Sequence, residues 1–128
     1  LRITKNYTVV KVNTLHLTDI LKEVLNSEEQ TVDIKLYKDV NAVIASIGNQ
    51  KVGALRVKPF ESYYQVDSVM VKPEFRNLGI GKEMYRVAFE SLGSLYSDSH
   101  QTSDAEKIWK SFINSGEAES IGKRYKMV

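Results

Sequence analysis

The feature that most constrains this chain is a glycine-rich stretch, EFRNLGIGKEM at residues 74–84, between an apolar run and a run of helical periodicity. Glycine has no side chain, so such a turn can bring the backbone close to another group. Two common phosphate motifs do not fit the stretch. A Walker A loop would need glycine at Arg76 and Ser or Thr at Glu83, and a dinucleotide-binding fingerprint would need a third glycine at Met84.

The pattern that remains is R-x-x-G-x-G, which runs from Arg76 to Gly81. It follows an apolar strand that ends at Pro73, and it precedes an amphipathic helix. At such a junction successive backbone N–H groups converge, and the helix N-terminus adds about half a positive charge. The stretch is either a tight corner that packs the helix against a sheet or a cradle for an anion. Its place between strand and helix favours the cradle, and a pyrophosphate suits it.

The residues before this stretch predict mainly strands. Residues 7–12 (YTVVKV) are β-branched and aromatic, which is typical of a strand. Thr18-Asp19 can then cap a helix with apolar residues on one face. These apolar residues are Leu17, Ile20, Leu21 and Val24. Between residues 42 and 71 three apolar runs, AVIASI, KVGALRV and YQVDSVMV, are separated by short turns and predict an antiparallel meander.

The residues after it predict two helices. One helix begins at Ile80 and ends at Gly93, and SLYS at residues 94–97 is a candidate short strand. Ser103 and Glu106 form a capping box for the second helix.

Gly116 ends that second helix, and a final strand is expected at residues 125–128. The order β-α-β-β-β-α-β-α-β predicts an α/β (α+β) fold, in which helices flank a mixed, mostly antiparallel sheet.

Composition limits the class of protein. The chain has 128 residues, 42% of them hydrophobic, which suits a single domain over residues 1–128. It has no cysteine, so no thiol can carry a covalent intermediate, and a cytoplasmic protein is expected. No apolar run is long enough for a membrane helix. The net charge of +2 does not indicate nucleic acid, and His16 and His100 without cysteine do not indicate a metal site.

The stretch VMVKPEFRNLGIG at residues 69–81 resembles the signature of the GNAT superfamily of acetyl-CoA-dependent N-acetyltransferases. In that family an apolar strand is followed by a Val-x-Pro-x-aromatic bridge and then by R-x-x-G-x-G. The resemblance implies the GNAT fold over most of the chain, with a terminal strand pair, and acetyl-CoA as co-substrate.

The resemblance also implies a place for each part of acetyl-CoA. The backbone amides of residues 77–82 would bind the pyrophosphate, and the main chain of residues 69–71 would bind the pantetheine arm. The cleft would lie between the strand that ends at Val71 and the segment 95–97. The residues that the resemblance assigns to the cofactor are Val69, Met70, Val71, Arg76, Asn77, Leu78, Gly79, Ile80, Gly81, Lys82 and Thr102.

The match is weaker at the residues that would perform the chemistry. In many family members a glutamate on the fourth strand removes the proton of the amine, but Gln65 stands at that place and cannot act as a base. Strand alternation puts Asp67 on the same face, so Asp67 is the expected base. The alternative interpretation is that Asp67 is only a polar strand residue that pairs with a neighbouring Lys or Arg. Asp98 and His100 are rival bases, because they follow the candidate strand at 94–97 and histidine titrates near neutrality.

Family members often carry a tyrosine four residues after an alanine in the helix that begins near residue 103. Counting from Ala105 puts Trp109 there, and an indole N–H is not acidic enough to transfer a proton. Tyr96, a nearby serine or water would then protonate the departing thiolate. The alternative interpretation is that Trp109 has no catalytic role and is a core residue that packs beside Ile108 and Phe112.

The expected function is therefore acetyl transfer to a primary amine by direct attack, with segment 97–102 at the border of the acceptor cleft. The resemblance permits a homodimer through the terminal strands, and segment 97–102 is similar to acetyltransferase-like proteins of bacteriophages. One alternative is a GNAT-fold protein that has lost its catalytic activity. Gln65 and Trp109, which replace common catalytic residues of the family, support this alternative. Another is a nucleic-acid-binding module, which rests on the basic run at residues 123–126.

Overall fold

A computed structural model describes residues 2–5, 9–11 and 31–128 of the chain. The strands form a six-stranded sheet in the order β2-β1-β3-β4-β5-β6 and a separate two-stranded hairpin, β7-β8. β1 and β3 are parallel, and the other paired strands of both sheets are antiparallel. The strands are β1 (Arg2–Lys5), β2 (Val9–Lys11), β3 (Thr31–Tyr37), β4 (Ala42–Ile47), β5 (Gln50–Pro59), β6 (Tyr64–Val71), β7 (Ala118–Ile121) and β8 (Arg124–Met127).

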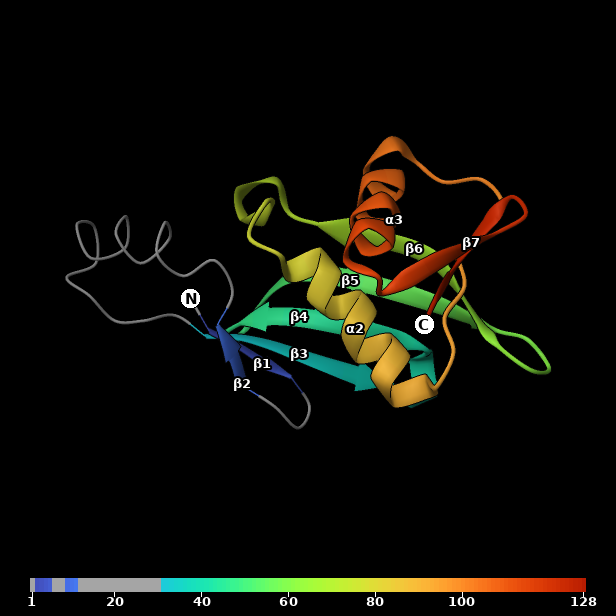
Figure 1. Cartoon of the computed structure of the whole chain (residues 1–128). Coiled ribbons are helices and arrows are strands. Elements are labelled where there is room, and N and C mark those ends of the chain that lie inside the picture. Colours follow the sequence, from blue (N-terminus) through green and yellow to red (C-terminus); the bar gives the residue numbers. More distant parts are fainter. Residues whose placement is uncertain (1, 6–8, 12–30) are drawn as a thin grey trace.

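Two described α-helices lie on one side of the large sheet (Figure 1). α2 (Ile80–Leu92) crosses the face formed by β3 to β6, and α3 (Ser103–Ser115) packs beside it and against β7. Their buried side chains meet those of the strands in one core. The largest fully buried side chains in that core are Trp109, Tyr85, Phe112, Ile34, Leu55, Ile80, Met84 and Leu95. The fold is therefore the mixed, mostly antiparallel α+β arrangement that the sequence predicts. No described helix is long and apolar enough to cross a membrane.

Glycine allows α2 to approach the sheet closely. A Cβ atom at Gly53 on β5 would lie 3.1 Å from the Met84 side chain and 3.2 Å from the backbone oxygen of Met70. At these distances the neighbouring atoms would have to shift by a few tenths of an ångström, which the end of the Met84 side chain can do more easily than the Met70 backbone. The start of α2, the middle of β5 and the end of β6 therefore form one tightly packed unit.

The predicted meander and the helix predicted to begin at Ile80 are confirmed. β4, β5 and β6 pair antiparallel in succession. α2 ends at Leu92, and its C-cap Gly93 has a φ of +83° and donates its N–H to the Phe89 carbonyl at 2.8 Å. A left-handed residue at this place satisfies a carbonyl that the helix leaves free, and glycine adopts it without strain.

Other expectations need correction. The N-cap of α3 is Thr102 rather than Ser103, because the Thr102 hydroxyl accepts the Ala105 N–H at 3.2 Å. β3 was not expected, although its apolar residues alternate with polar ones. The final strand expected at 125–128 is the second strand of a hairpin.

Two further expectations concern short strands. Tyr96, in the candidate strand at 94–97, makes isolated bridges to β6 and β8 instead of forming a longer strand. At residues 7–12 the structure shows a strand at Val9–Lys11. The predicted helix capped by Thr18-Asp19 lies outside the described residues.

β6 contains a β-bulge at Asp67. Arg56 pairs with Ser68 and Val57 pairs with Val66, so Asp67 is an extra residue between the two pairs. Consecutive residues of a strand face opposite sides, and the extra residue interrupts this alternation. Val66 therefore points into the core, whereas Asp67 and Ser68 both lie on the opposite face and are exposed.

Candidate functional site

A pocket of about 460 Å³ lies where the end of β6, the glycine-rich loop and the start of α3 meet. Residues from all three segments line it, so it depends on the packing of α2 and α3 against the sheet. The lining residues are Val69, Met70, Val71, Phe75, Arg76, Asn77, Gly79, Ile80, Gly81, Lys82, Asp104, Lys107 and Ile108. Nine of the eleven residues predicted to hold the cofactor are among them. The other two are Leu78, which is buried in the core, and Thr102, which caps α3.

The loop backbone is shaped by left-handed residues. Asn77 has a φ of +63° and Gly79 a φ of +86°, and Gly79 is the N-cap of α2 without a side-chain hydrogen bond. The Glu83 N–H donates to the Gly79 carbonyl at 3.1 Å. The N–H groups of residues 80–82 precede this bond and have no intrahelical acceptor. These three residues line the pocket at the positive end of the helix dipole, so their N–H groups are suited to bind an anion there.

Gly81 lies between α3 and the end of β6. A Cβ atom there would be 3.3 Å from the Cδ1 of Ile108 and 3.8 Å from the Cγ2 of Val71. A larger side chain at position 81 would therefore enter the pocket or displace its wall. Arg76 also lines the pocket, and its Nε donates to the Val71 carbonyl at 2.9 Å. This hydrogen bond connects the loop to the last residue of β6.

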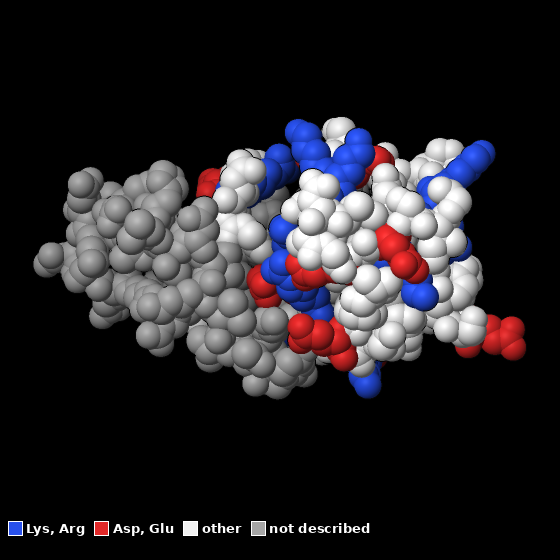
Figure 2. All heavy atoms as spheres, in the orientation of Figure 1, with Lys and Arg blue, Asp and Glu red and all other residues white. Residues whose placement is uncertain are grey.

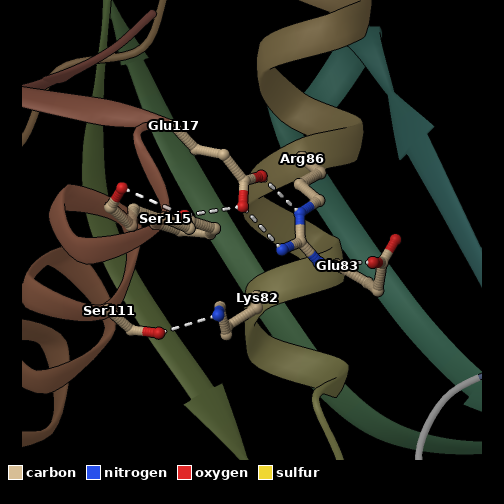
Figure 3. Close-up of polar contacts among 7 residues, drawn as sticks. Lys82, Glu83, Arg86, Ser111, Ser115 and Glu117 are labelled. Atoms are coloured by element: carbon tan, nitrogen blue, oxygen red, sulfur yellow. Dashed lines mark hydrogen bonds and ion pairs between the residues drawn. The ribbon is translucent and has the colours of Figure 1, made fainter.

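Lys82 and Arg86 connect α2 to α3 (Figure 3). Lys82 Nζ donates to Ser111 Oγ at 2.7 Å and lies 5.2 Å from the centre of the Phe112 ring. Arg86 binds Glu83 Oε1 at 2.6 Å and both carboxylate oxygens of Glu117, at 2.7 and 3.0 Å. These contacts hold the helix that begins at the pocket against the end of α3.

The ion pairs shift the pKa values of their members. Hydrogen bonds from Arg86 and from Ser115 lower the pKa of Glu117 from its ordinary value of 4.5 to about 2, against the opposing effect of burial. The pKa of Arg86 is raised, chiefly by its hydrogen bonds to Glu117 and Glu83. Both groups are therefore charged at neutral pH. Basic and acidic side chains are interspersed over this face of the molecule and do not form a surface of one sign (Figure 2).

The three residues predicted to be catalytic lie outside the pocket lining. Asp67 is exposed at the bulge of β6, two residues before the first lining residue of that strand. Tyr96 bridges β6 and β8, and its ring lies 4.9 Å from that of Tyr63. His100 is on an exposed loop, with Nδ1 3.1 Å from Ser99 Oγ, and its rival Asp98 accepts the Ser99 N–H. Of the three, Asp67 is the closest in sequence to a residue of the pocket lining.

Trp109 is a core residue, as its alternative interpretation predicted. Its side chain is 1% exposed, makes an edge contact with the Tyr85 ring at 5.3 Å and stacks on Tyr125 at 5.8 Å. The Tyr125 hydroxyl donates to Glu106 Oε1 at 2.7 Å, which raises the pKa of Tyr125. Trp109 therefore holds α3 and β8 together.

Gln65 has a partner that the sequence did not indicate. Arg124 on β8 donates from Nη2 to Gln65 Oε1 at 2.9 Å and from Nε to the Ser97 carbonyl at 3.1 Å. Its guanidinium also lies 5.1 Å from the centre of the Tyr96 ring and 5.2 Å from that of Tyr63. Gln65 and Arg124 are separated by 59 positions in the sequence, so no local pattern could have paired them.

Comparisons with known proteins agree with this geometry. The model of the acetyltransferase (GNAT) family matches residues 13–100. No curated protein sequence matches the chain at a significant level. YhhK from Escherichia coli, solved with bound coenzyme A, has a TM-score of 0.56 at 15% identity over 85% of each chain.

Two proteins of Pyrococcus horikoshii have similar structures. PH1933 has a TM-score of 0.54 at 16% identity over 68% of this chain, and a longer protein has a TM-score of 0.53 at 19% identity over 59% of this chain. The chain spans 64% of PH1933 and 28% of the longer protein. The family match covers the meander, the glycine-rich loop and α2, which together form most of the pocket. The chain therefore belongs to the GNAT family of acetyltransferases.

Proposed function

We propose that this protein is an N-acetyltransferase that uses acetyl-CoA and acylates a primary amine by direct attack in a ternary complex. The observation that carries the proposal is the pocket at the end of β6, which the first residues of α2 line. YhhK, which shares the fold, binds coenzyme A.

The pocket suits the two polar parts of coenzyme A. The N–H groups of residues 77–82 would bind the pyrophosphate, and Arg76, Lys82 and Lys107 add positive charge to the lining. Residues 69–71 of β6 pair with β5 on one side only. Their other edge offers backbone groups to the amides of the pantetheine arm, which would extend the sheet.

The chemistry would take place where the pantetheine arm passes Asp67. The neutral amine attacks the thioester carbonyl carbon, a C–N bond forms, and the C–S bond breaks. Asp67 takes the proton that the amine loses, and the departing thiolate takes a proton from Tyr96 or from water. Because a free thiol has a pKa of about 8.5, this second transfer does not require a strong acid.

Calorimetric titration with acetyl-CoA and with CoA tests the proposal. The wild-type protein should bind with one site per chain, and Gly81→Asp should not bind, because its carboxylate would occupy the pyrophosphate position. Gly48→Asp is the matched control: it adds the same charge at a left-handed turn residue with no atom within 4 Å of an added Cβ. No binding to the wild-type protein at millimolar ligand would refute the proposal.

A second candidate is a GNAT-fold protein that binds acetyl-CoA without transferring the acyl group. Gln65 favours it, because the amide cannot act as a base and its oxygen already accepts a hydrogen bond from Arg124. Trp109 favours it as well, because it fills the core where many relatives carry tyrosine. Release of free CoA from acetyl-CoA over a panel of amines distinguishes the two candidates. Binding without amine-dependent release would support the second.

A further inference from the structure

The sheet face opposite α2 and α3 carries a group of polar residues beside the bridge between β6 and Tyr96. Tyr96 pairs with Gln65 in parallel and with Lys126 antiparallel, and paired residues share a face. Arg124 is two residues before Lys126, so it lies on the same face. Asp67 also lies there, because it follows Gln65 by two residues and Val66 between them points into the core.

Arg124 is fixed at the centre of this group by stacking as well as by hydrogen bonds. Its guanidinium lies 5.2 and 5.1 Å from the ring centres of Tyr63 and Tyr96, and these two centres are 4.9 Å apart. Lys126 Nζ lies 5.7 Å from the Tyr96 ring centre. The two rings thus contact these cations and one another, and they help to position Arg124.

The contact with Arg124 fixes the orientation of the Gln65 amide. A guanidinium only donates hydrogen bonds, so the Gln65 atom that it contacts must be the oxygen Oε1. The amide nitrogen Nε2 then points elsewhere, with two N–H groups that donate to no described residue. Gln65 therefore presents only donors to whatever lies beside it on this face.

Arg124 has donors to spare as well. Of the five N–H groups of an arginine, two serve the bonds to Gln65 and Ser97. Among the described residues, neither Arg124 nor Lys126 forms an ion pair. Carboxylates do occur near this group, but all are exposed and none forms a described ion pair with these cations. They are Asp67, Asp98, Glu61 and Glu119, the last of which pairs with Lys126 across the hairpin.

We propose that this donor group, Gln65 and Arg124 with Lys126 beside them, binds a carboxylate on the acceptor, so that the acceptor is an amine of amino-acid type. This inference rests on the proposed function. Asp67 lies two residues beyond Gln65 on the same face, about 7 Å along an extended strand. A small α-amino acid can therefore place its carboxylate at Gln65 and Arg124 and its amine at Asp67. Polyamines carry no carboxylate, and the positive charges of Arg124 and Lys126 would repel them.

Matched pairs of amines test the inference. Leucine, phenylalanine and lysine are compared with isopentylamine, phenethylamine and cadaverine, the same molecules without the carboxylate. Acetyl-CoA binding is measured first by calorimetry, and CoA release is then measured for each amine. We expect kcat/KM to be roughly tenfold higher or more for the carboxylate member of at least one pair, as charge-assisted hydrogen bonds allow. Arg124→Met should reduce that ratio towards one.

Two other variants make the test specific. Gln65→Glu should lower the ratio as well, because a carboxylate beside Arg124 would neutralise it and repel the acceptor. Lys35→Met is the matched control: it removes an exposed cation from β3, which β4 and β5 separate from β6, and should leave the ratio unchanged. Circular dichroism and thermal unfolding show whether each variant is folded.

The outcomes separate this inference from the proposed function. If acetyl-CoA does not bind, both are overturned. If it binds but no amine reacts, calorimetry compares N-acetylleucine with N-acetylisopentylamine on the CoA-saturated protein. Tighter binding of the carboxylate, lost in Arg124→Met, supports the inference. Equal rates and equal binding within the pairs, or preference for the amine without a carboxylate, overturn it and leave the proposed function in place.

Discussion

Asp67 is the residue on which the proposed reaction depends most directly. Replacing it with asparagine keeps the shape of the side chain but removes the base, so kcat should fall by roughly 10²- to 10⁴-fold. Binding of acetyl-CoA should be unchanged, because Asp67 is not part of the pocket lining. Steady-state kinetics together with calorimetry measure both quantities.

The rival bases provide the control for Asp67. Asp98→Asn and His100→Ala change exposed residues of the loop before α3, and neither should alter kcat by more than a few-fold. A large loss in His100→Ala with little change in Asp67→Asn would show that the base has been assigned to the wrong residue.

Residue-level expectations from the sequence succeeded where the signal is local and failed where it is not. The loop from Arg76 to Gly81 could be recognised because its glycines lie between a strand and a helix. The hydrogen bond between Gln65 and Arg124 could not be predicted, because nothing in a sequence says which residues meet across 59 positions. Thr102 and Ser103 are adjacent and both suit an N-cap, so only the hydrogen bond to Ala105 distinguishes them.

Two kinds of contact hold α2 and α3 together. One is the packing of aromatic rings around Trp109, and the other is the ion pair between Arg86 and Glu117. Trp109 is almost completely buried and contacts rings of α2, α3 and β8. Truncation to alanine removes these contacts and leaves a cavity, so we expect a loss of about 3–5 kcal/mol in the free energy of unfolding. Urea denaturation measures it. A loss below 1 kcal/mol would mean that the site repacks or that the indole does not hold the elements together.

The ion pair between Arg86 and Glu117 predicts how the joint between α2 and the end of α3 responds to acid. The pKa of Glu117 is about 2 in the folded protein, below the ordinary value of 4.5. The pair therefore stabilises the fold fully above about pH 4.5, and this contribution is lost as the pH falls towards 2. Because the Glu117 side chain is 34% exposed, solvent screening limits the effect.

Glu117→Gln should accordingly destabilise the protein at pH 7, and its difference from wild type should shrink between pH 4.5 and 3. Urea denaturation at these three pH values measures the difference. Glu119→Gln, which removes an exposed carboxylate of β7 without a described ion pair, is the matched control. A difference that stays constant over this range would contradict the assigned pKa.

Strands were predicted correctly where turn residues mark both of their ends. β4, β5 and β6 were predicted because Gly48-Asn49 and the segment after Pro59 mark the turns between apolar runs. β3 was missed although Val32, Ile34 and Leu36 alternate with polar residues, because no glycine or proline marks its start. The pairing of the short segment at Tyr96 with both β6 and β8 depends on tertiary contacts that periodicity does not express.

For the whole molecule, binding of acetyl-CoA should raise the thermal stability, because the ligand binds the folded chain and not the unfolded one. At a ligand concentration of 100 Kd the gain is about 2.7 kcal/mol. For a domain of this size each kcal/mol corresponds to roughly 3–5 °C, so Tm should rise by about 8–13 °C. Differential scanning calorimetry measures the shift. Adenosine, which lacks the pyrophosphate, should give no comparable shift, and an equal shift would place binding elsewhere.

The bulge at Asp67 also restricts how the length of this chain can change. The extra residue puts Asp67 and Ser68 on one face, while Val69 and Val71 pack towards the core and Met70 is exposed. Deleting Asp67 would make the Val57–Val66 and Arg56–Ser68 pairs consecutive, which would restore simple alternation in β6 without changing either register. The sheet should therefore tolerate loss of this one residue, whereas a deletion elsewhere in β6 would turn side chains of the core to the other face of the sheet.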